Sequence, residues 1–447
     1  MRGCTKSAYK YVFLSITGIV RAMQIHLKTL GCRLNEAELE SWAEDFQSKG
    51  HRLTDKPEHA DLLVVNTCAV TQEAVKKSRQ IIRRTHRNNS TAKLVVSGCY
   101  ASLDEKIQYD IPGIDLLIKN QQKDQLVDIA LKELNFETMP ALSTEPGEAS
   151  IFKRGRNRAF IKIQDGCRYR CTFCIVTVAR GNERSRTETD IIKDINQFHQ
   201  QGVQEIVLTG VHVGGYGSEL DSNLYQLIKT ILSNTDIPRI RLASVEPWDL
   251  PEEFFSLFSN KRLMPHMHLP LQSGSDSVLK RMARRCKTND YKKIIQQARK
   301  EIPDFNLTTD IIVGFPGETK EEWQESLNFI AETIFSHIHI FTYSKREGTK
   351  AATLANQVDS SIKKERSKQL HILSNSMRQS SLMNQIGKTH AVLWEARNEN
   401  DKWMGYTENF IRVELKDTYA SELENKISKV KITGVTENAS HGIAEFI

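Results

Sequence analysis

The sequence contains few cysteines for its length and no long apolar run. Eight cysteines in 447 residues are too few for the disulfide framework of a small secreted protein. No apolar run reaches the roughly 18 residues that a membrane-spanning helix needs, which excludes a transmembrane protein. Disordered and low-complexity classes are also excluded, because 39% of the residues are hydrophobic and 26% are charged. The net charge of +7 permits an anionic partner such as RNA without proving one.

The first 22 residues show no clear structural pattern. Arg2, Lys6 and Lys10 precede the apolar stretch 11–20, which faintly resembles a signal peptide. No small-residue cleavage site follows cleanly. We therefore expect residues 1–22 to be a disordered extension or the result of a translation start assigned too far upstream. We expect the folded part to begin near Met23.

Residues 23–137 alternate short apolar runs with helical patterns. Continuous apolar runs such as DLLVVN and KLVVS are typical of buried parallel strands. The alternation predicts a doubly wound parallel sheet in an α/β domain. The stretch 138–150 has the composition of a linker, with prolines, acids and small residues. Strands are expected at 24–30, 61–66, 93–97 and 114–118, and helices at 36–49 and 72–87.

A second series of strands and helices occupies residues 151–378. Six βα units predict a (βα)6 partial TIM barrel. Strands are expected at 160–164, 205–208, 239–243, 267–269, 307–313 and 338–342. Helices are expected at 188–200, 225–232, 252–259, 291–300 and 320–333, followed by a charged helix at 361–383.

Residues 379–447 change to short alternating strands without helices between them. Five such strands predict a small OB-like β-barrel, a frequent RNA-binding module. The stretch has eight Lys and Arg against ten Asp and Glu. It therefore lacks a net positive charge that would bind RNA phosphates over the whole domain. RNA contact there would depend on one basic edge and on aromatic residues such as Trp403, Tyr406 and Phe410. A module that only packs against its neighbours is the alternative.

The strongest chemical signal is the CxxxCxxC spacing of Cys167, Cys171 and Cys174. It lies on the loop after an expected strand, so three thiolates can face one metal centre. Structural zinc sites use four ligands, and no fourth Cys or His lies nearby, although a distant residue could complete such a site. Three thiolates suit a [4Fe–4S] cluster with one iron left open.

A second set of cysteines is dispersed along the chain. Cys32, Cys68 and Cys99 each follow an expected parallel strand, and loops at the carboxyl ends of parallel strands converge on one crevice. A single cysteine is more often a small buried residue. Three at equivalent strand ends predict a second cluster, again with an open iron. Cys4 and Cys286 fit neither set.

Longer motifs resemble the radical S-adenosylmethionine (SAM) methylthiotransferases, over residues 23–447. The segments GCRLN, VHVGGYG and IVTVARG look most like the branch that acts on threonylcarbamoyladenosine in tRNA. The branches for isopentenyladenosine in tRNA and for a ribosomal-protein aspartate differ there. Cys286 is a departure, since relatives usually carry an aromatic residue in that segment. The matching segments are TLGCRLNEAE, VNTCAVT, SGCYA, KIQDGCRYRCTFCIVTVARG, LTGVHVGGYG, HLPLQSGSD and TTDIIVGFPGET.

The resemblance implies a radical SAM domain at 151–378, an N-terminal methylthiotransferase domain with an auxiliary cluster at 23–137, and an RNA-binding TRAM domain at 379–447. It implies two [4Fe–4S] clusters and SAM as cofactors. The cluster at Cys167, Cys171 and Cys174 would cleave SAM to a 5′-deoxyadenosyl radical. A second SAM would supply the methyl group to sulfur held at the other cluster.

The implied substrate is N6-threonylcarbamoyladenosine at position 37, in the anticodon stem-loop of tRNA, and the methylthio group would be added at C2. The resemblance also implies an electron donor such as flavodoxin or ferredoxin, a cytoplasmic location and no membrane partner.

Carboxyl ends of barrel strands build the active sites of such barrels. This rule predicts eight residues that face SAM. A glycine-rich loop at Gly214, Gly215 and Gly217 is a weaker candidate, because a surface turn is equally expected. Glu246 could bind the SAM ammonium or only cap the helix before Pro251. The eight residues are Thr209, Gly210, Ser244, Glu246, Gln272, Ser273, Asp310 and Gly314.

Three basic runs are candidate RNA contacts. A single run is usually a solvated face, but three of them beside an OB-like domain favour RNA binding. The runs are Lys76, Lys77, Arg79, Arg83, Arg84 and Arg87; Lys153, Arg154, Arg156 and Arg158; and Lys280, Arg281, Arg284, Arg285 and Lys287.

The leading hypothesis is therefore an RNA-modifying radical enzyme. The alternative from another class is an iron–sulfur protein that binds RNA or transfers electrons without SAM chemistry. Electron carriers normally bind their clusters through four ligands, and the three-cysteine spacing argues against that alternative.

Overall fold

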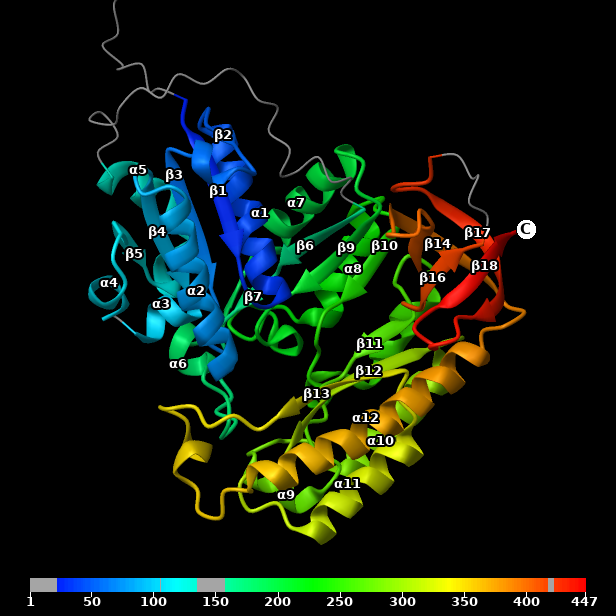
Figure 1. Cartoon of the computed structure of the whole chain (residues 1–447). Coiled ribbons are helices and arrows are strands. Elements are labelled where there is room, and N and C mark those ends of the chain that lie inside the picture. Colours follow the sequence, from blue (N-terminus) through cyan, green and yellow to red (C-terminus); the bar gives the residue numbers. More distant parts are fainter. Residues whose placement is uncertain (1–21, 105, 135–156, 417–421) are drawn as a thin grey trace, which may run out of the picture.

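The computed structural model describes residues 22–104, 106–134, 157–416 and 422–447. Figure 1 shows an N-terminal α/β unit in blue and cyan, a central unit in green and yellow, and a β-barrel in red. Within the described residues, no helix is both long and apolar enough to cross a membrane. Residues 1–21 of the expected extension and all of the expected linker lie outside the described ranges.

The N-terminal unit is a five-stranded parallel sheet in the order β2-β1-β3-β4-β5. The four expected strands are present, and the structure adds the short edge strand β2. The expected doubly wound parallel sheet is confirmed. The strands are β1 (Gln24–Thr29), β2 (Arg52–Leu53), β3 (Leu62–Thr67), β4 (Lys93–Gly98) and β5 (Leu116–Ile118).

Helices cover both faces of this sheet. Alternate residues of β3 enter different apolar clusters: Val64 packs with residues of α1 and α5, and Leu63 packs with residues of α2 and α4. Burial on both faces explains the unbroken apolar run of this strand. The helices are α1 (Arg33–Ser48), α2 (Gln72–Asn88), α3 (Cys99–Leu103), α4 (Ile107–Asp110) and α5 (Leu126–Glu133).

The central unit contains the six expected strands in two parallel three-stranded sheets, β6-β9-β10 and β11-β12-β13. Bridges between Ile240 and Leu263 and between Ser244 and His268 join the two sheets. The result is a six-stranded partial barrel, as expected, with β6 and β13 at its two edges. The strands are β6 (Arg158–Lys162), β9 (Glu205–Thr209), β10 (Arg239–Leu242), β11 (His266–His268), β12 (Asn306–Val313) and β13 (His337–Thr342).

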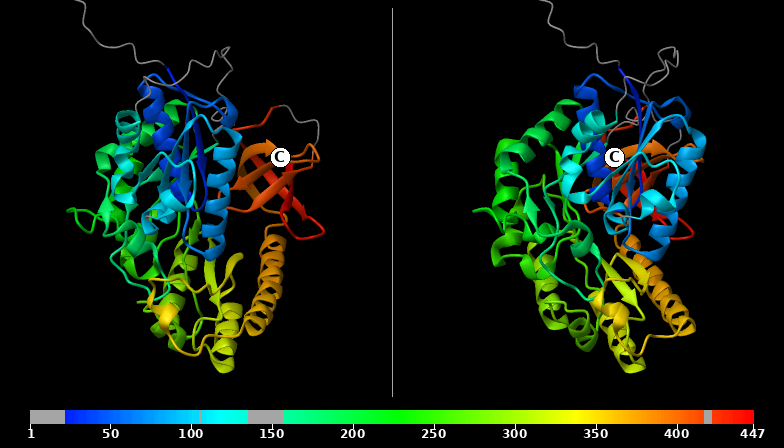
Figure 2. Two further views of the ribbon diagram at one scale, coloured as in Figure 1. Left: turned by 60° about the vertical axis from the view of Figure 1, so that its left-hand side comes forward. Right: turned by 90° about the vertical axis from the view of Figure 1, so that its left-hand side faces the viewer.

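The outer face of this barrel is apolar and covered by helices, and Figure 2 shows α12 in orange running beside the yellow strands toward the red barrel. The segment 252–259, which the sequence predicts to be an α-helix, is the 3-10 helix η6. Its three-residue repeat places Phe254 and Leu257 on the same face. The helices are α7 (Glu188–Gln200), α8 (Leu224–Asn234), η6 (Glu252–Ser259), α10 (Thr288–Glu301), α11 (Lys320–Thr333) and α12 (Ser360–Met383).

Shorter elements shape the connections. The pair β7–β8 is antiparallel and follows the first barrel strand. These elements are η1 (Pro57–His59), η2 (Asn120–Gln125), β7 (Gln164–Asp165), α6 (Val176–Arg180), β8 (Arg184–Ser185), η4 (Val213–Gly215), η5 (Pro247–Asp249), α9 (Asp276–Arg281) and η7 (Lys350–Thr353).

The C-terminal strands close into a barrel in the order β14-β15-β16-β18-β17. Trp394, Trp403 and Val430 are buried in its core. The expected five-stranded small β-barrel is confirmed. The strands are β14 (Thr389–Arg397), β15 (Trp403–Thr407), β16 (Arg412–Leu415), β17 (Ile427–Val435) and β18 (Gly442–Phe446).

This small barrel covers the amino end of the central barrel. Arg241 donates hydrogen bonds to the main-chain oxygens of Glu408 and Thr407, at 2.9 and 2.8 Å. The ring of Phe410, in the turn between β15 and β16, lies 4.8 Å from the ring of His266 at the start of β11. The turn therefore seals the end of the barrel opposite to the carboxyl ends of its strands.

The aromatic residues expected to contact RNA face the wrong way for that role. Trp403 is only 3% exposed. Tyr406 stacks on Phe410 with ring centroids 4.7 Å apart, and Arg158 lies over both rings. The expectation that these aromatics form an RNA surface is wrong, because Trp403 lies in the core of the small barrel and the rings of Tyr406 and Phe410 cover the charged amino end of the central barrel.

Candidate functional site

The dispersed cysteines come together at the carboxyl edge of the N-terminal sheet. Cys32 follows β1 and Cys68 follows β3, the two neighbouring strands at which the strand order reverses, and such switch points are where doubly wound sheets bind ligands. Burial raises the pKa of Cys68 to about 11, and the nearby thiols of Cys99 and Cys32 raise it further. A Cβ on Gly31 would lie 3.1 Å from the Cys68 sulfur, so glycine permits this close approach.

The contiguous cysteines lie on the loop between β7 and α6. The amide of Cys174 donates to the carbonyl of Cys171 at 3.0 Å, which forms a tight turn between two of them. Burial raises the pKa of Cys167 to about 12 and that of Cys174 to about 11, and neighbouring thiols add to both shifts. Desolvated thiols are costly to ionise by themselves. A cluster iron binds thiolates directly, and this donor set therefore fits a [4Fe–4S] cluster.

Arg180, the last residue of α6, connects the two cysteine sets. Its Nε donates to the Cys99 sulfur at 3.3 Å, and its guanidinium also donates to Asn35 in α1 at 2.9 Å. Cys99 also affects the pKa of Cys174. The two candidate clusters thus lie on facing sides of the boundary between the N-terminal sheet and the central barrel.

The charges around Arg180 are buried and balanced. The guanidinium lies 2.8 Å from a Glu38 oxygen and 2.9 Å from an Asp165 oxygen, with Arg180 only 2% exposed. Lys123 is a second buried cation on Glu38. Burial would raise the pKa of Glu38, but Arg180 and Lys123 hold it well below its ordinary value. These groups fix the N-terminal sheet against the carboxyl end of the barrel.

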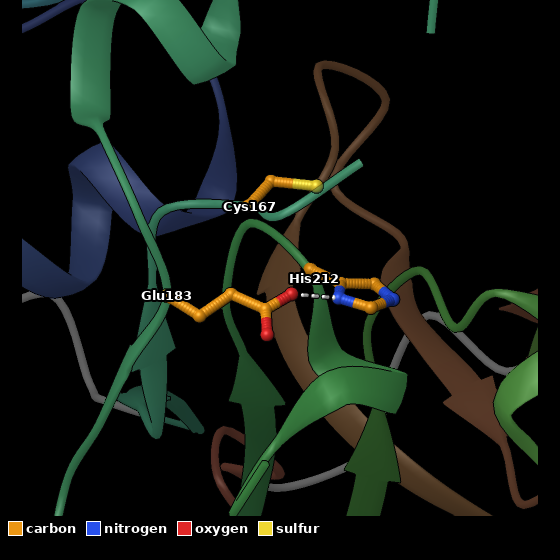
Figure 3. Close-up of side chains that lie close together, drawn as sticks. All are labelled: Cys167, Glu183 and His212. Carbon is orange, nitrogen blue, oxygen red and sulfur yellow. Dashed lines mark hydrogen bonds and ion pairs between the residues drawn. The ribbon is translucent and has the colours of Figure 1, made fainter. Parts of the chain in front are cut away.

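A buried histidine lies beside Cys167, as Figure 3 shows. The His212 ring contacts Glu183 through Nδ1 at 2.5 Å and Asp249 through Nε2 at 2.6 Å. Burial alone would lower the pKa of His212, but its hydrogen bonds and neighbouring carboxylates raise it overall. Suitable ligand atoms of Cys167, Glu183 and His212 lie within 4.8 Å of one another. A zinc site there would use only one cysteine of the set, which favours the three-thiolate interpretation.

Glu246 is a strong candidate for a cation-binding group near Cys167. Its Oε2 atom is buried, and no described residue forms a hydrogen bond with it. Burial raises the pKa of Glu246, while the nearest basic group, His212, is 3.7 Å away and already bonded to Asp249 and Glu183. A buried carboxylate oxygen without a donor fits an ammonium group such as that of SAM.

The other expected SAM residues differ in exposure. Gln272 has a positive φ of 74°, an uncommon conformation for a residue other than glycine that often occurs at functional sites. Its main chain is held by hydrogen bonds to Asp310 and Ile312 of β12. Thr209 and Ser273 are buried, Ser244 is exposed, and Gly210 and Asp310 are partly exposed.

Gly314 is less accessible than expected. It is buried, and a Cβ at this position would collide with the side chain of Lys363 in α12. Its amide donates to Glu318 at 2.9 Å. The backbone of Gly314 therefore packs beneath α12.

The glycine-rich loop packs closely around His212. A Cβ on Gly215 would collide with the His212 ring, and one on Gly214 would lie 2.9 Å from the Cβ of Asp249. These glycines let the main chain approach the buried histidine, which accounts for the motif without a cofactor contact.

The three basic runs have different surroundings. All six basic residues of the first run are exposed on α2, which also carries Glu73 in its first turn. In the second run, Lys153, Arg154 and Arg156 lie outside the described residues, and Arg158 is paired with Glu205. In that run, Arg158 is therefore not available to RNA.

In the third run, Arg281 pairs with Glu322, and Arg284 lies 4.3 Å over the ring of Trp248. Lys280, Arg285 and Lys287 remain exposed. Arg284 also lies 3.9 Å from the Cys171 sulfur, which places it at the contiguous cysteine set.

Sequence reasoning missed the roles of Arg180, Glu38 and His212, and it named Arg284 only as a candidate RNA contact. Arg180, His212 and Glu38 stand inside motifs quoted for the resemblance, IVTVARG, VHVGGYG and TLGCRLNEAE, and this was the only sequence signal for them. The role of each depends on a partner far away in the chain.

Comparison with known proteins gives two family matches and long similarities. Residues 161–330 match the Radical SAM superfamily, and residues 24–119 match the Uncharacterized protein family UPF0004. The chain is 36% identical over 423 residues to threonylcarbamoyladenosine tRNA methylthiotransferase MtaB of Bacillus subtilis, covering 90% of this chain and 92% of that protein. It is 32% identical over 431 residues to the tRNA-2-methylthio-N(6)-dimethylallyladenosine synthase of Bacillus subtilis, covering 93% and 84%.

A solved structure supports the fold. The radical SAM methyltransferase TsrM of Kitasatospora setae is 14% identical to this chain, with a TM-score of 0.56, covering 74% of this chain and 77% of TsrM. At this identity the likeness concerns the fold alone.

Proposed function

The chain belongs to the radical SAM methylthiotransferases of tRNA, and we propose that it converts N6-threonylcarbamoyladenosine at position 37 into its 2-methylthio derivative. Relatives with this activity in their names are 34–36% identical over 83–92% of the chain. The enzyme uses SAM and [4Fe–4S] clusters.

The observation that carries the proposal is the meeting of two three-cysteine sets at one domain boundary. Replacing the hydrogen on adenine C2 by sulfur needs radical chemistry, which the clusters and SAM supply when bound. Cys167, Cys171 and Cys174 would hold one cluster, and Cys32, Cys68 and Cys99 the other. Arg180 contacts Cys99 from the helix that directly follows the first set.

The remaining site residues would bind SAM or hold other side chains of the site in place. Glu246, with its unpartnered oxygen, would accept a hydrogen bond from the SAM ammonium. His212 would hold Asp249 and Glu183 in place beside Cys167. Thr209, Gly210, Ser244, Gln272, Ser273 and Asp310 line the carboxyl ends of the barrel strands and are proposed to face SAM.

Domain roles and partners follow from the same family. We propose residues 23–137 as the auxiliary-cluster domain, 151–378 as the radical SAM domain and 379–447 as the TRAM domain. The substrate is tRNA. A cytoplasmic location and an electron donor such as flavodoxin or ferredoxin are further parts of the proposal, supported by the need for reduced clusters.

The test is methylthiolation of a stem-loop RNA by the anaerobically reconstituted full chain, followed by nucleoside mass spectrometry and iron analysis. RNA bearing N6-threonylcarbamoyladenosine should gain a methylthio group, and the protein should hold about eight irons. Replacing Cys167, Cys171 and Cys174 by Ala should abolish the product and leave about four irons. Cys286→Ala, whose buried thiol lies outside both sets, is the control and should change neither result. Product on isopentenyladenosine RNA alone would contradict the substrate assignment.

A further inference from the structure

Three histidines gather on the inward face of the central barrel. Met267, Leu307 and Ile338 of the three neighbouring strands β11, β12 and β13 pack outward against the helices. Side chains alternate along a strand, and His268 and His339 therefore point inward. The ring centroids of His268 and His339 are 5.5 Å apart, and those of His337 and His339 are 4.7 Å apart.

One carboxylate accompanies these histidines. Asp310 of β12 lies 3.2 Å from Nε2 of His268 and is paired with it. Burial lowers the pKa of His337 to about 4, and the neighbouring His339 and Arg378 lower it further. Partial desolvation and the neighbouring His268 also lower the pKa of His339, although its side chain reaches solvent. Burial and the neighbouring positive groups therefore disfavour the protonated forms of His337 and His339.

This inward face remains accessible. His339 is exposed, and Phe341, two residues farther along the same face of β13, is 46% exposed. Phe341 lies toward the carboxyl ends of the strands, where the cysteines are. Two residues of a strand span about 6.6 Å. A base stacked on Phe341 could thus extend a short substituent to His339.

We propose that His337 and His339 bind the carboxylate of the N6-threonylcarbamoyl group of the substrate, while His268 behind them is held by Thr308 and Asp310. The inference rests on the proposed function and specifies how its substrate is selected. An entering carboxylate would accept hydrogen bonds from the imidazoles and favour their protonated forms, because an adjacent negative charge stabilises imidazolium. A substrate with an apolar N6 group would leave His337 and His339 without this partner, which disfavours its binding.

The test compares two stem-loop RNAs that differ in one group. One carries N6-threonylcarbamoyladenosine, and the other carries its carboxamide analogue, in which a neutral NH2 group replaces one carboxylate oxygen. Binding to the reconstituted protein is measured by fluorescence anisotropy without reductant, so that no turnover occurs. The unaltered protein should bind the carboxylate RNA at least about tenfold more tightly, as one charge-assisted hydrogen bond allows.

The double variant His337→Ala/His339→Ala should lose this preference and retain its affinity for the carboxamide RNA. His337→Gln/His339→Gln keeps hydrogen-bond donors without the charge and should retain part of the preference. His59→Gln, an exposed histidine of the N-terminal unit, is the control and should keep all of it. Iron content and melting temperature verify that each variant is folded and loaded.

Equal binding of the two RNAs by the unaltered protein, or full preference in the double Ala variant, would overturn the inference. Ligand atoms of His268, Asp310 and His339 also lie within 4.8 Å of one another. Loss of one bound metal ion beyond the cluster iron in His339→Ala would make this a metal site and overturn the inference as well. Methylthiolation of N6-threonylcarbamoyladenosine RNA with no carboxylate preference would refute this inference alone, whereas no methylthiolation would refute the proposed function.

Discussion

The two ends of the central barrel are covered by different domains, and buried arginines make the contacts at both. At the carboxyl end, Arg180 bonds to side chains: two carboxylates, an amide and the thiol of Cys99. At the amino end, Arg241 donates hydrogen bonds to main-chain oxygens of the small barrel. Arg239 likewise donates a hydrogen bond to the main-chain oxygen of Ala391. The contacts at the carboxyl end thus include a proposed cluster ligand, Cys99, whereas those at the amino end join only groups that the protein satisfies by itself.

We infer that the contacts at the carboxyl end serve the function of the protein, whereas those at the amino end only stabilise the fold. A change at the carboxyl end should alter the clusters as well as the stability, because Arg180 contacts a proposed cluster ligand. A change at the amino end should alter only stability, because Arg241 contacts no proposed ligand. Two substitutions test this distinction and a third variant tests a surface outside both ends, in order of decreasing expected effect on stability.

The largest effect is expected for Arg180→Ala. It leaves Glu38 and Asp165 buried with one cation fewer, and breaking such a pair costs about 3–5 kcal/mol of unfolding free energy. Iron content should fall toward about four per chain, because the sheet that carries Cys99 loses its contact with the barrel. Chemical denaturation and iron analysis measure both effects.

Arg180→Lys is the matched variant and should recover only part of the loss, since one ammonium cannot reach four acceptors arranged around a planar guanidinium. Arg33→Ala removes an exposed pair with Glu36 and should change stability by less than about 1 kcal/mol. Full iron content in a folded Arg180→Ala protein would contradict a link between this residue and the cluster.

A smaller loss, about 2–3 kcal/mol, is expected for Arg241→Ala at the amino end. Burial lowers the pKa of Arg241 to about 10, so the group is still charged at neutral pH and lies 2.9 Å from Glu205. Its removal leaves Glu205 with Arg158 and Arg239, which limits the damage. Iron content and SAM cleavage by the folded protein should not change. A fall in iron content equal to that of Arg180→Ala would remove the distinction between the two ends.

No stability effect is expected for Arg83→Gln/Arg84→Gln/Arg87→Gln on α2, a surface outside both ends. The three side chains are exposed, and no ion pair holds them among the described residues. If tRNA lies there, each lost phosphate contact should make the salt dependence of binding shallower by about 0.7–0.9 in logarithmic slope. Binding titrations at several salt concentrations measure the slope, with exposed Arg52→Gln as control. An unchanged slope would remove α2 from the RNA surface.

The amino end also changes how a truncation should be interpreted. From the sequence, residues 379–447 look like a separate RNA module whose removal spares the rest. In the structure their removal would expose the charged cluster of Arg158, Glu205 and Arg241 together with the face covered by Phe410. A deletion would therefore disturb the barrel itself, and point substitutions give clearer answers.

Local patterns were sufficient for much of the fold. Continuous apolar runs located β3 and β4, because a strand buried on both faces is apolar over most of its length. Helical periodicity gave α7 and α11 to the residue. The segment 252–259 was mistaken for an α-helix, since four apolar residues in eight suit both windings.

Candidate site residues were predictable where chemistry and spacing coincide. Cys167, Cys171 and Cys174 stand within eight residues, and their joint role follows from the spacing alone. Cys32, Cys68 and Cys99 required the added rule that parallel strands end on one edge. Phe410 and Arg158 were misjudged as RNA contacts, because aromatic and basic side chains serve equally well to seal a domain boundary.

The sequence by itself indicated the three units, the contiguous cysteine set and the family, because each depends on periodicity, spacing or motifs that are continuous in the chain. Only the tertiary structure decided what each buried charge meets. Arg180 reaches the carboxylate of Glu38 across 142 positions, and Arg241 reaches the main-chain oxygen of Glu408 across 167. Neither pair has a local signature. The energy of a buried charge depends on what surrounds it in space, and that environment exists only once the domains are packed together.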